Sequence, residues 1–208
     1  VVRHEPGRDG GEKDFYLQRL LPDGTWQSKL GNTRRVPFRL PLVRAAVATG
    51  QPVYVVEGEK DALRIESRGY AATCNPMGAG NWRDEYAQHL DGAVHVGIVA
   101  DRDPQGIQHA EKVARSLEGK VADLRIFLPA VDAEHADVTD HLDAGHSLAD
   151  LVPLTDEARA AVCRAGATTG DAAGTTKSAN LAELPTGDGL IRDPRAVGVV
   201  EHAERVRE

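Results

Sequence analysis

Two kinds of apolar pattern alternate along the middle of the chain. Short runs rich in β-branched residues predict strands at Val53–Val56, Tyr70–Cys74, Ala93–Ala100 and Val121–Leu128. Apolar residues at helical spacing predict helices at Asp61–Arg68, around Trp82–Leu90 and from Pro104 to Leu117. Because strands alternate with helices, we expect residues 51–153 to form a Rossmann-like α/β domain, with a parallel central sheet flanked by helices.

The first fifty residues have a different pattern. Phe15–Leu20 and Thr25–Leu30 flank the turn sequence Pro22-Asp23-Gly24 and predict an antiparallel β-hairpin. Pro41 then stands at the first position of a short predicted helix that ends at Gly50. Residues 1–10 are expected to be disordered. The sequence therefore predicts an N-terminal arm over residues 1–50, with a hairpin and a short helix.

The chain becomes less regular after the fourth predicted strand. An acidic segment occupies residues 137–142, and a small helix is predicted near Ser147–Leu151. After about Ala165 the composition shifts to Gly, Ala, Thr and Ser, which is typical of a linker. We expect residues 154–208 to be a C-terminal helix or linker and a tail, partly disordered.

Charge is unevenly distributed along the 208 residues. The net charge is −7, which argues against strong nonspecific binding of duplex DNA by the whole chain. Residues 1–44 nevertheless carry a charge of +4, while the remainder carries −11. A basic flank beside an acidic body is suited to laying nucleic acid across one edge of a metal site. An arm with ordinary surface charge is an equally good interpretation.

Several protein classes are excluded by composition. No apolar run approaches the length of a membrane-spanning helix, and no signal-peptide core is present, so we expect a cytoplasmic protein without a membrane partner. The two cysteines, Cys74 and Cys163, do not suggest a disulfide framework or a zinc finger. The eight histidines lack cysteine partners and a zinc-ligand spacing, which favours exposed loop histidines.

Two of the predicted strands stop abruptly at carboxylates. Glu57 follows the first strand, and Asp101 and Asp103 follow the third. The carboxyl ends of parallel strands are where open α/β sheets bind ligands, so these acids are expected to gather at one edge. Oxygen ligands of this kind, few in number, suit Mg²⁺ or Mn²⁺ that also binds substrate phosphates. Asp103 alone is equally well explained as a helix N-cap.

Other residues near these acids are candidates for supporting roles. Asp61 stands in the first turn of a predicted helix, where it either supports a metal site or favours the helix dipole. Lys60, Arg83 and Arg102 are candidate phosphate contacts. The glycine-rich loop that contains Gly78 and Gly80 precedes a helix and could offer N–H groups to a phosphate, although such loops are more often only turns.

The order of these motifs resembles the Toprim family. The matching residues are the strand ending in Glu57-Gly58, then Asp61, then the strand ending in Asp101-Arg102-Asp103. The resemblance covers about residues 51 to 152 and is greatest to the primase or primase-helicase proteins of bacteria, phages and mobile elements. It implies a Toprim fold, catalysis and metal binding by Glu57, Asp101 and Asp103, and support from Asp61 and Asp140.

The resemblance also implies a function. We expect a DNA primase-like nucleotidyltransferase of DNA replication that makes primers on single-stranded DNA from nucleotides with Mg²⁺ or Mn²⁺. A replicative helicase, or a fused helicase domain, would be a further partner. The sequence departs from such primases in lacking an N-terminal zinc-binding module. The alternatives are a Toprim nuclease that hydrolyses phosphodiesters, and a non-catalytic module that binds nucleic acid or a helicase.

Overall fold

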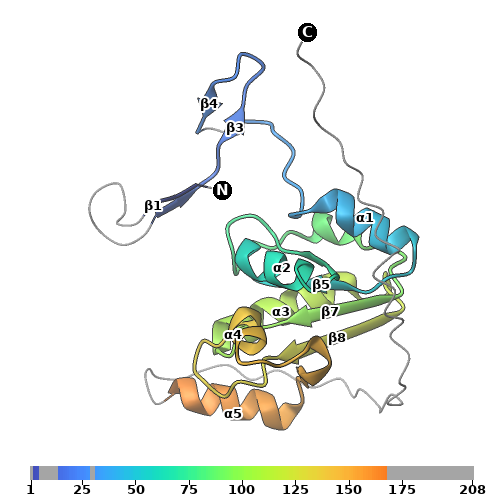
Figure 1. The fold of residues 1–208 in the computed structure, drawn as a ribbon, viewed down its shortest axis with the longest axis vertical. Coiled ribbons are helices and arrows are strands. Elements are labelled where there is room, and N and C mark those ends of the chain that lie inside the picture. The colour runs from blue at the N-terminus through green and yellow to red at the C-terminus, as the bar shows by residue number, and fades with distance from the viewer. Residues whose placement is uncertain (1, 5–13, 29–30, 168–208) are drawn as a thin grey trace. The chain divides into compact units, whose positions relative to one another are not determined.

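A computed structural model describes residues 2–4, 14–28 and 31–167. In this part of the chain, a five-stranded sheet has the strand order β6-β5-β7-β8-β9 (Figure 1). Its strands are β5 (Val53–Val55), β6 (Ala71–Thr73), β7 (His95–Val99), β8 (Asp123–Leu128) and β9 (Val152–Pro153). The first four are mutually parallel, whereas β9 pairs antiparallel with β8.

The prediction of an α/β fold with a parallel central sheet is therefore confirmed for the four predicted strands. These strands lie at the predicted places, because strands covered on both faces are apolar throughout and such runs are visible in the sequence. The antiparallel β9 was not predicted. Two residues carry no periodic signal, and their pairing with Phe127 and Leu128 depends on the tertiary fold.

Side chains of alternate strand residues enter two separate apolar cores. Val53 and Val55 face a core built with α1 (Leu40–Ala48), α3 (Pro104–Leu117) and α5 (Asp156–Ala167). Tyr54 and Val56 face a second core, built with α2 (Glu59–Glu66) and α4 (Val138–Asp143). The sheet is thus the middle layer of three, as the period of two along a strand requires (Figure 1).

Two of the predicted helices differ from the observed elements, and one observed helix was not predicted. The predicted helix around Trp82–Leu90 is a 3₁₀ helix, η1 (Asp84–His89), and the small helix near Ser147–Leu151 is a 3₁₀ turn, η2 (Leu148–Asp150). The acidic segment at 137–142 forms α4. Asp137 caps α4 reciprocally with Asp140, which explains how a segment with little helix propensity begins a helix.

The N-terminal arm contains the predicted hairpin, formed by β3 and β4, and a second short antiparallel pair that was not predicted. β1 (Val2–His4) pairs with β2 (Asp14–Tyr16), and β3 (Arg19–Leu20) pairs with β4 (Trp26–Gln27). The turn between β3 and β4 was correctly predicted: the side chain of Asp23 accepts from the Thr25 N–H at 2.9 Å. Disorder was wrongly predicted for residues 2–4, which pair as a strand.

The two edge strands of the sheet, β6 and β9, are both short. At one edge the Phe38 N–H donates to Cys74 O at 2.9 Å, and the Thr73 hydroxyl donates to Phe38 O at 2.6 Å. At the other edge lies β9, whose two residues include Pro153.

None of the helices in the described ranges has the length and apolar content that crossing a membrane requires. The predicted linker and tail lie, beyond residue 167, outside the described residues.

Candidate functional site

Two neighbouring strands of the sheet end at acidic side chains. Glu57 follows β5 and Asp101 follows β7, and these strands are adjacent and parallel. From β5 the chain passes to β6 on one side, and it later returns to pair β7 on the other side of β5. The two acids therefore lie where the strand order reverses, the place at which open α/β sheets bind their ligands.

The side chains of Glu57 and Asp101 hydrogen-bond to each other, and we call them the carboxylate pair. The pKa of Asp101 is raised to about 8, first by burial and then by the negative charges of Glu57 and Asp61. Burial and the charge of Asp103 also raise the pKa of Glu57, against hydrogen bonds from the Ala79 N–H and Asp101 that lower it. The pair therefore retains a proton at neutral pH unless a cation replaces it.

Asp103 lies beside the carboxylate pair, but both of its oxygens already have partners. As the N-cap of α3, its Oδ1 accepts from the Gly106 N–H at 2.7 Å. Its Oδ2 lies 2.8 Å from Nδ1 of the exposed His135, and this hydrogen bond raises the pKa of His135. The helix-cap interpretation of Asp103 is thus correct, and its charge still acts on Glu57.

Asp61 and Lys60 are directed toward α4. The hydroxyl of Thr139 donates to Asp61 Oδ1 at 2.6 Å, and Asp61 is only 7% exposed. Lys60 Nζ lies 2.8 Å from Asp137 Oδ2. Burial raises the pKa of Asp61, and its negative charge is felt by Glu57 and Asp101. Asp61 is therefore close to the carboxylate pair, whereas Lys60 is occupied by an ion pair.

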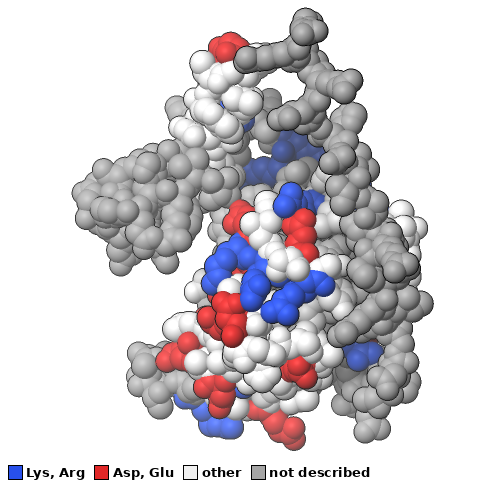
Figure 2. Space-filling view, viewed as in Figure 1, with Lys and Arg blue, Asp and Glu red and all other residues white. Residues whose placement is uncertain are grey.

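Asp140, the other supporting residue implied by the resemblance, is exposed and takes part in the cap of α4. Its Oδ2 accepts from the Asp137 N–H at 3.1 Å, while its own N–H donates to Asp137 Oδ1 at 2.8 Å. Figure 2 shows Lys and Arg side chains gathered over α2 with acidic side chains beside them. Ion pairs such as that of Arg64 with Asp143 join α2 to α4 there.

The loop of residues 75–81, here called the glycine loop, bends sharply next to Glu57. Met77, Gly78 and Gly80 all have left-handed backbone conformations, with φ of 73°, 69° and 78°. The side-chain amide of Asn75, fully buried, donates to Gly78 O at 2.7 Å and holds the turn from inside. The loop brings the Ala79 N–H to the carboxylate of Glu57.

Helix α3 holds the far end of the glycine loop. The Gly80 N–H donates to His109 Nδ1 at 3.1 Å, and Lys112 Nζ donates to Gly80 O at 3.0 Å. Burial lowers the pKa of His109 to about 4, so the imidazole is neutral and its Nδ1 can accept. Of the two predicted phosphate-binding glycines, Gly80 already uses its N–H within the protein.

The two predicted phosphate-binding arginines lie in different surroundings. Arg83 is exposed and pairs with Glu85 at 2.9 Å. Arg102 is largely buried: its Nε donates to Val131 O at 3.2 Å, and its Nη2 lies 3.1 Å from Asp132. Arg102 therefore fastens the loop after β8, whereas Arg83 is free to reach solvent.

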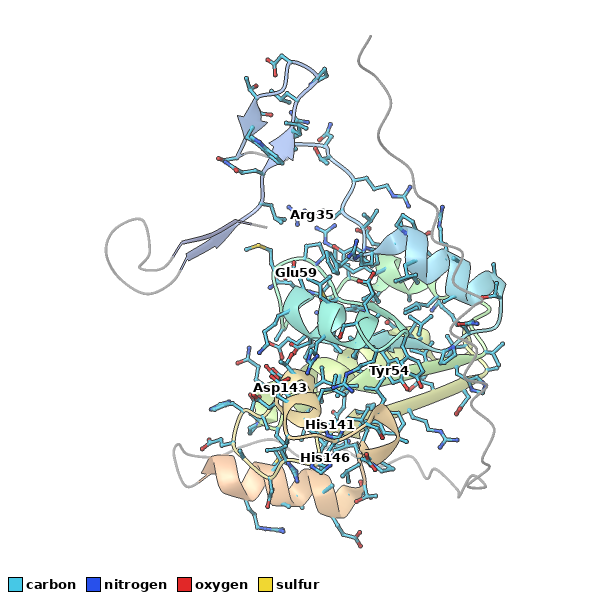
Figure 3. All side chains as sticks on the ribbon, viewed as in Figure 1. Arg35, Tyr54, Glu59, His141, Asp143 and His146 are labelled. Atoms are coloured by element: carbon cyan, nitrogen blue, oxygen red, sulfur yellow. The ribbon has the colours of Figure 1, made fainter. Side chains whose placement is uncertain are left out.

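Histidines of the α4 region have structural partners. His141 is fully buried, where its Nδ1 accepts from the Ala130 N–H at 3.0 Å and its Nε2 lies 2.8 Å from Ser147 O. Its ring stacks on His146, with ring centroids 5.0 Å apart (Figure 3). These contacts occupy both nitrogens of His141. The expectation of exposed loop histidines is therefore wrong for His141, which is buried in α4.

The donor set at the strand ends suits a hard cation that keeps most of its water. Among the described residues, no group of three or more His, Cys, Asp or Glu side chains is arranged to hold a metal ion. The carboxylate pair by itself supplies two half-buried carboxylate ligands that repel each other when both are ionised. Mg²⁺ is commonly bound by one or two carboxylates together with waters and substrate phosphates. The residues present fit that mode and not a closed protein cage.

Sequence reasoning missed Thr139, His135 and His109, which contact the candidate site residues. Each stands in a segment that gives no local indication of its partner, and each partner is 29 to 78 residues away in the chain.

No protein-family model matches this chain, and comparison with curated protein sequences finds no match either.

Proposed function

We propose that this chain is a Toprim-type catalytic domain that transfers nucleotidyl groups during primer synthesis on single-stranded DNA. The observation that carries the proposal is the carboxylate pair: two half-buried acids from adjacent parallel strands, hydrogen-bonded to each other, with a pKa of Asp101 raised to about 8. Natural folds seldom retain such repulsion unless a ligand relieves it, because it lowers the free energy of unfolding.

Glu57 and Asp101 would hold Mg²⁺ or Mn²⁺, with Asp103 and Asp61 adding negative charge nearby. When bound, the ion would neutralise nucleotide phosphates and help to align an in-line phosphoryl transfer. Glu57 has a second role in the proposal. Its raised pKa suits it to accept the proton of an attacking hydroxyl, and the Ala79 N–H orients its carboxylate.

The matched pair of variants that tests this assignment is Asp101→Asn and Asp91→Asn. Asp91 is an exposed aspartate in the turn before β7, so its amide variant controls for loss of one surface charge. We expect Asp101→Asn to reduce metal-dependent primer synthesis on single-stranded DNA about 100-fold or more. Unchanged synthesis in this variant, with Asp91→Asn equally active, would reject the assignment.

A non-catalytic nucleic-acid module is the second candidate. It is favoured by one observation: within the described ranges, no three ligand side chains already surround a point where a metal could sit. Calorimetric titration with millimolar Mg²⁺ or Mn²⁺ separates the two. Metal binding that Asp101→Asn abolishes supports catalysis, whereas no binding with or without nucleotide supports the module. Release of fragments from a labelled strand without added nucleotides would instead identify a nuclease.

A further inference from the structure

A polar hollow lies between residues 31–35 and the segment Arg83–His89. Its volume is about 420 Å³, and we call it the arginine pocket because Arg34, Arg35 and Arg83 all line it. The carboxylate pair does not line it. A space of this size holds roughly one nucleotide.

The charge in the arginine pocket is predominantly positive. Three arginines face one acidic residue, Glu85, which is already paired with Arg83. Arg34 directs Nη2 to Nε2 of the largely buried His89 at 3.3 Å. Burial and the positive charges of Arg34 and Arg44 lower the pKa of His89. Positive charge is therefore concentrated around the neutral imidazole of His89, and an anionic ligand would compensate this charge.

A second hollow of about 260 Å³ adjoins the arginine pocket. The two share Arg35 and Arg83 as lining residues, and the second also touches Met77 and Asn81 of the glycine loop. Met77 is 40% exposed in its left-handed conformation and presents apolar surface to this hollow. Figure 3 labels Arg35, which lines both hollows. Polar and apolar surfaces thus follow one another from the arginine pocket to the loop that touches Glu57.

We infer that the arginine pocket binds backbone phosphates of a single-stranded nucleic acid, whose next base lies against Met77 on the way to the carboxylate pair. This inference rests on the proposed function, because that proposal makes the carboxylate pair the place toward which the strand runs. The arginines provide bidentate donors to phosphate oxygens, and Met77 provides apolar contact for a base. The two adjoining hollows, each of about nucleotide size, suit successive nucleotides of a single strand.

The test is fluorescence anisotropy with a labelled deoxythymidine 12-mer, measured in EDTA so that catalytic metal plays no part. We expect the double variant Arg34→Ala/Arg35→Ala to bind at least 10-fold more weakly at 50 mM salt. The slope of log affinity against log salt should fall in magnitude by about 1 to 1.5, because two phosphate contacts are lost. The variant Arg34→Lys/Arg35→Lys should recover part of the affinity.

Arg115→Ala is the matched control, because Arg115 is an exposed arginine on α3 whose contact with Glu111 is a long 4.0 Å. Binding by the double alanine variant equal to that of Arg115→Ala would overturn the inference. So would inorganic phosphate that displaces the 12-mer at low millimolar concentration, since the pocket would then take free phosphate. Equal melting temperatures for all variants ensure that weaker binding does not reflect unfolding.

The outcome is separable from that of the proposed function. Arginine-dependent strand binding without primer synthesis would support the pocket and refute the catalytic proposal. Primer synthesis together with unaltered strand binding in the double variant would support the catalytic proposal and refute the binding role of the arginine pocket. Asp91→Asn should bind the 12-mer in EDTA as tightly as the unaltered chain does, because Asp91 does not line the arginine pocket.

Discussion

At the scale of single residues, ionisation of Asp101 lowers the free energy of unfolding, and its surroundings do not compensate for this loss. Its pKa of about 8 means that ionisation at neutral pH opposes folding, since the unfolded chain ionises near pH 3.8 without penalty. The protonated form is favoured by its hydrogen bond with Glu57. An amide at the same position would keep a donor for Glu57 and remove the charge.

We therefore expect Asp101→Asn to raise the free energy of unfolding by about 2 kcal/mol at pH 7.5 in EDTA, although the same change should abolish metal binding. Urea unfolding followed by circular dichroism measures the gain. Asp91→Asn should change stability by less than about 0.5 kcal/mol, because Asp91 is exposed. A loss of stability in Asp101→Asn would contradict the account of the carboxylate pair.

At the scale of elements, polar contacts attach α2 to α4 along the rim of the site. Lys60–Asp137, Asp61–Thr139 and Arg64–Asp143 succeed one another along the two helices. Two of these are surface ion pairs of small energetic value. Asp61–Thr139 differs because Asp61 is buried, so the loss of the Thr139 hydroxyl removes the largest of the contacts that stabilise its carboxylate.

Thr139→Ala should accordingly lower the free energy of unfolding by about 1–3 kcal/mol and raise the pKa of Asp61 further. Thr139→Ser keeps the hydroxyl and is expected to lose less than half as much. Chemical denaturation of both variants measures the difference. Equal destabilisation by serine and alanine would show that the methyl group, and not the hydrogen bond to Asp61, is what matters.

The start of α3 also controls the end of β7. A Cβ atom at Gly106 would lie 2.7 Å from Asp101 O and 2.9 Å from Asp101 N, both backbone atoms that cannot move aside cheaply. We expect Gly106→Ala to cost about 2–4 kcal/mol in a thermal melt and to displace Asp101. Gly58→Ala is the control: Gly58 has φ of −126°, and its added Cβ would lie 3.6 Å from the nearest atom. Similar losses for both would contradict the steric explanation.

These elements show what sequence patterns reveal and what they do not. The run Val53–Val56 and the N-cap Asp103 were predictable, because strand burial and helix capping leave local signals. The contact of Thr139 with Asp61 was not, since it joins residues 78 positions apart. Lys60 and Gly80 were read as phosphate contacts because their partners, Asp137 and His109, come from other elements.

At the scale of the whole molecule, opposing titrations shape the dependence of stability on pH. The raised pKa values of Asp101, Glu57 and Asp61 each make the folded state lose stability as the pH rises above 4. The lowered pKa of His109 acts in the other direction. Its neutral form is required in the fold, so stability is lost as the pH falls from 6.5 toward 4.

His109→Gln should isolate the histidine contribution. Glutamine can still accept from the Gly80 N–H but does not titrate, so the unaltered chain should lose stability relative to this variant between pH 6.5 and 4. The relative loss should reach on the order of 3 kcal/mol at pH 4. Urea unfolding at half-unit pH steps measures it. Parallel stability curves for the two proteins would refute a buried neutral His109.

The short edge strands of the sheet have a consequence for how the protein behaves at high concentration. An exposed strand with free backbone groups can recruit a strand from another molecule and begin a fibril. Here β6 has only three residues and Phe38 bonds to Cys74 O at its end, while β9 is only two residues long and contains Pro153, which has no N–H to donate. The described domain therefore presents little template for intermolecular strand addition, and we expect it to resist amyloid-like self-association.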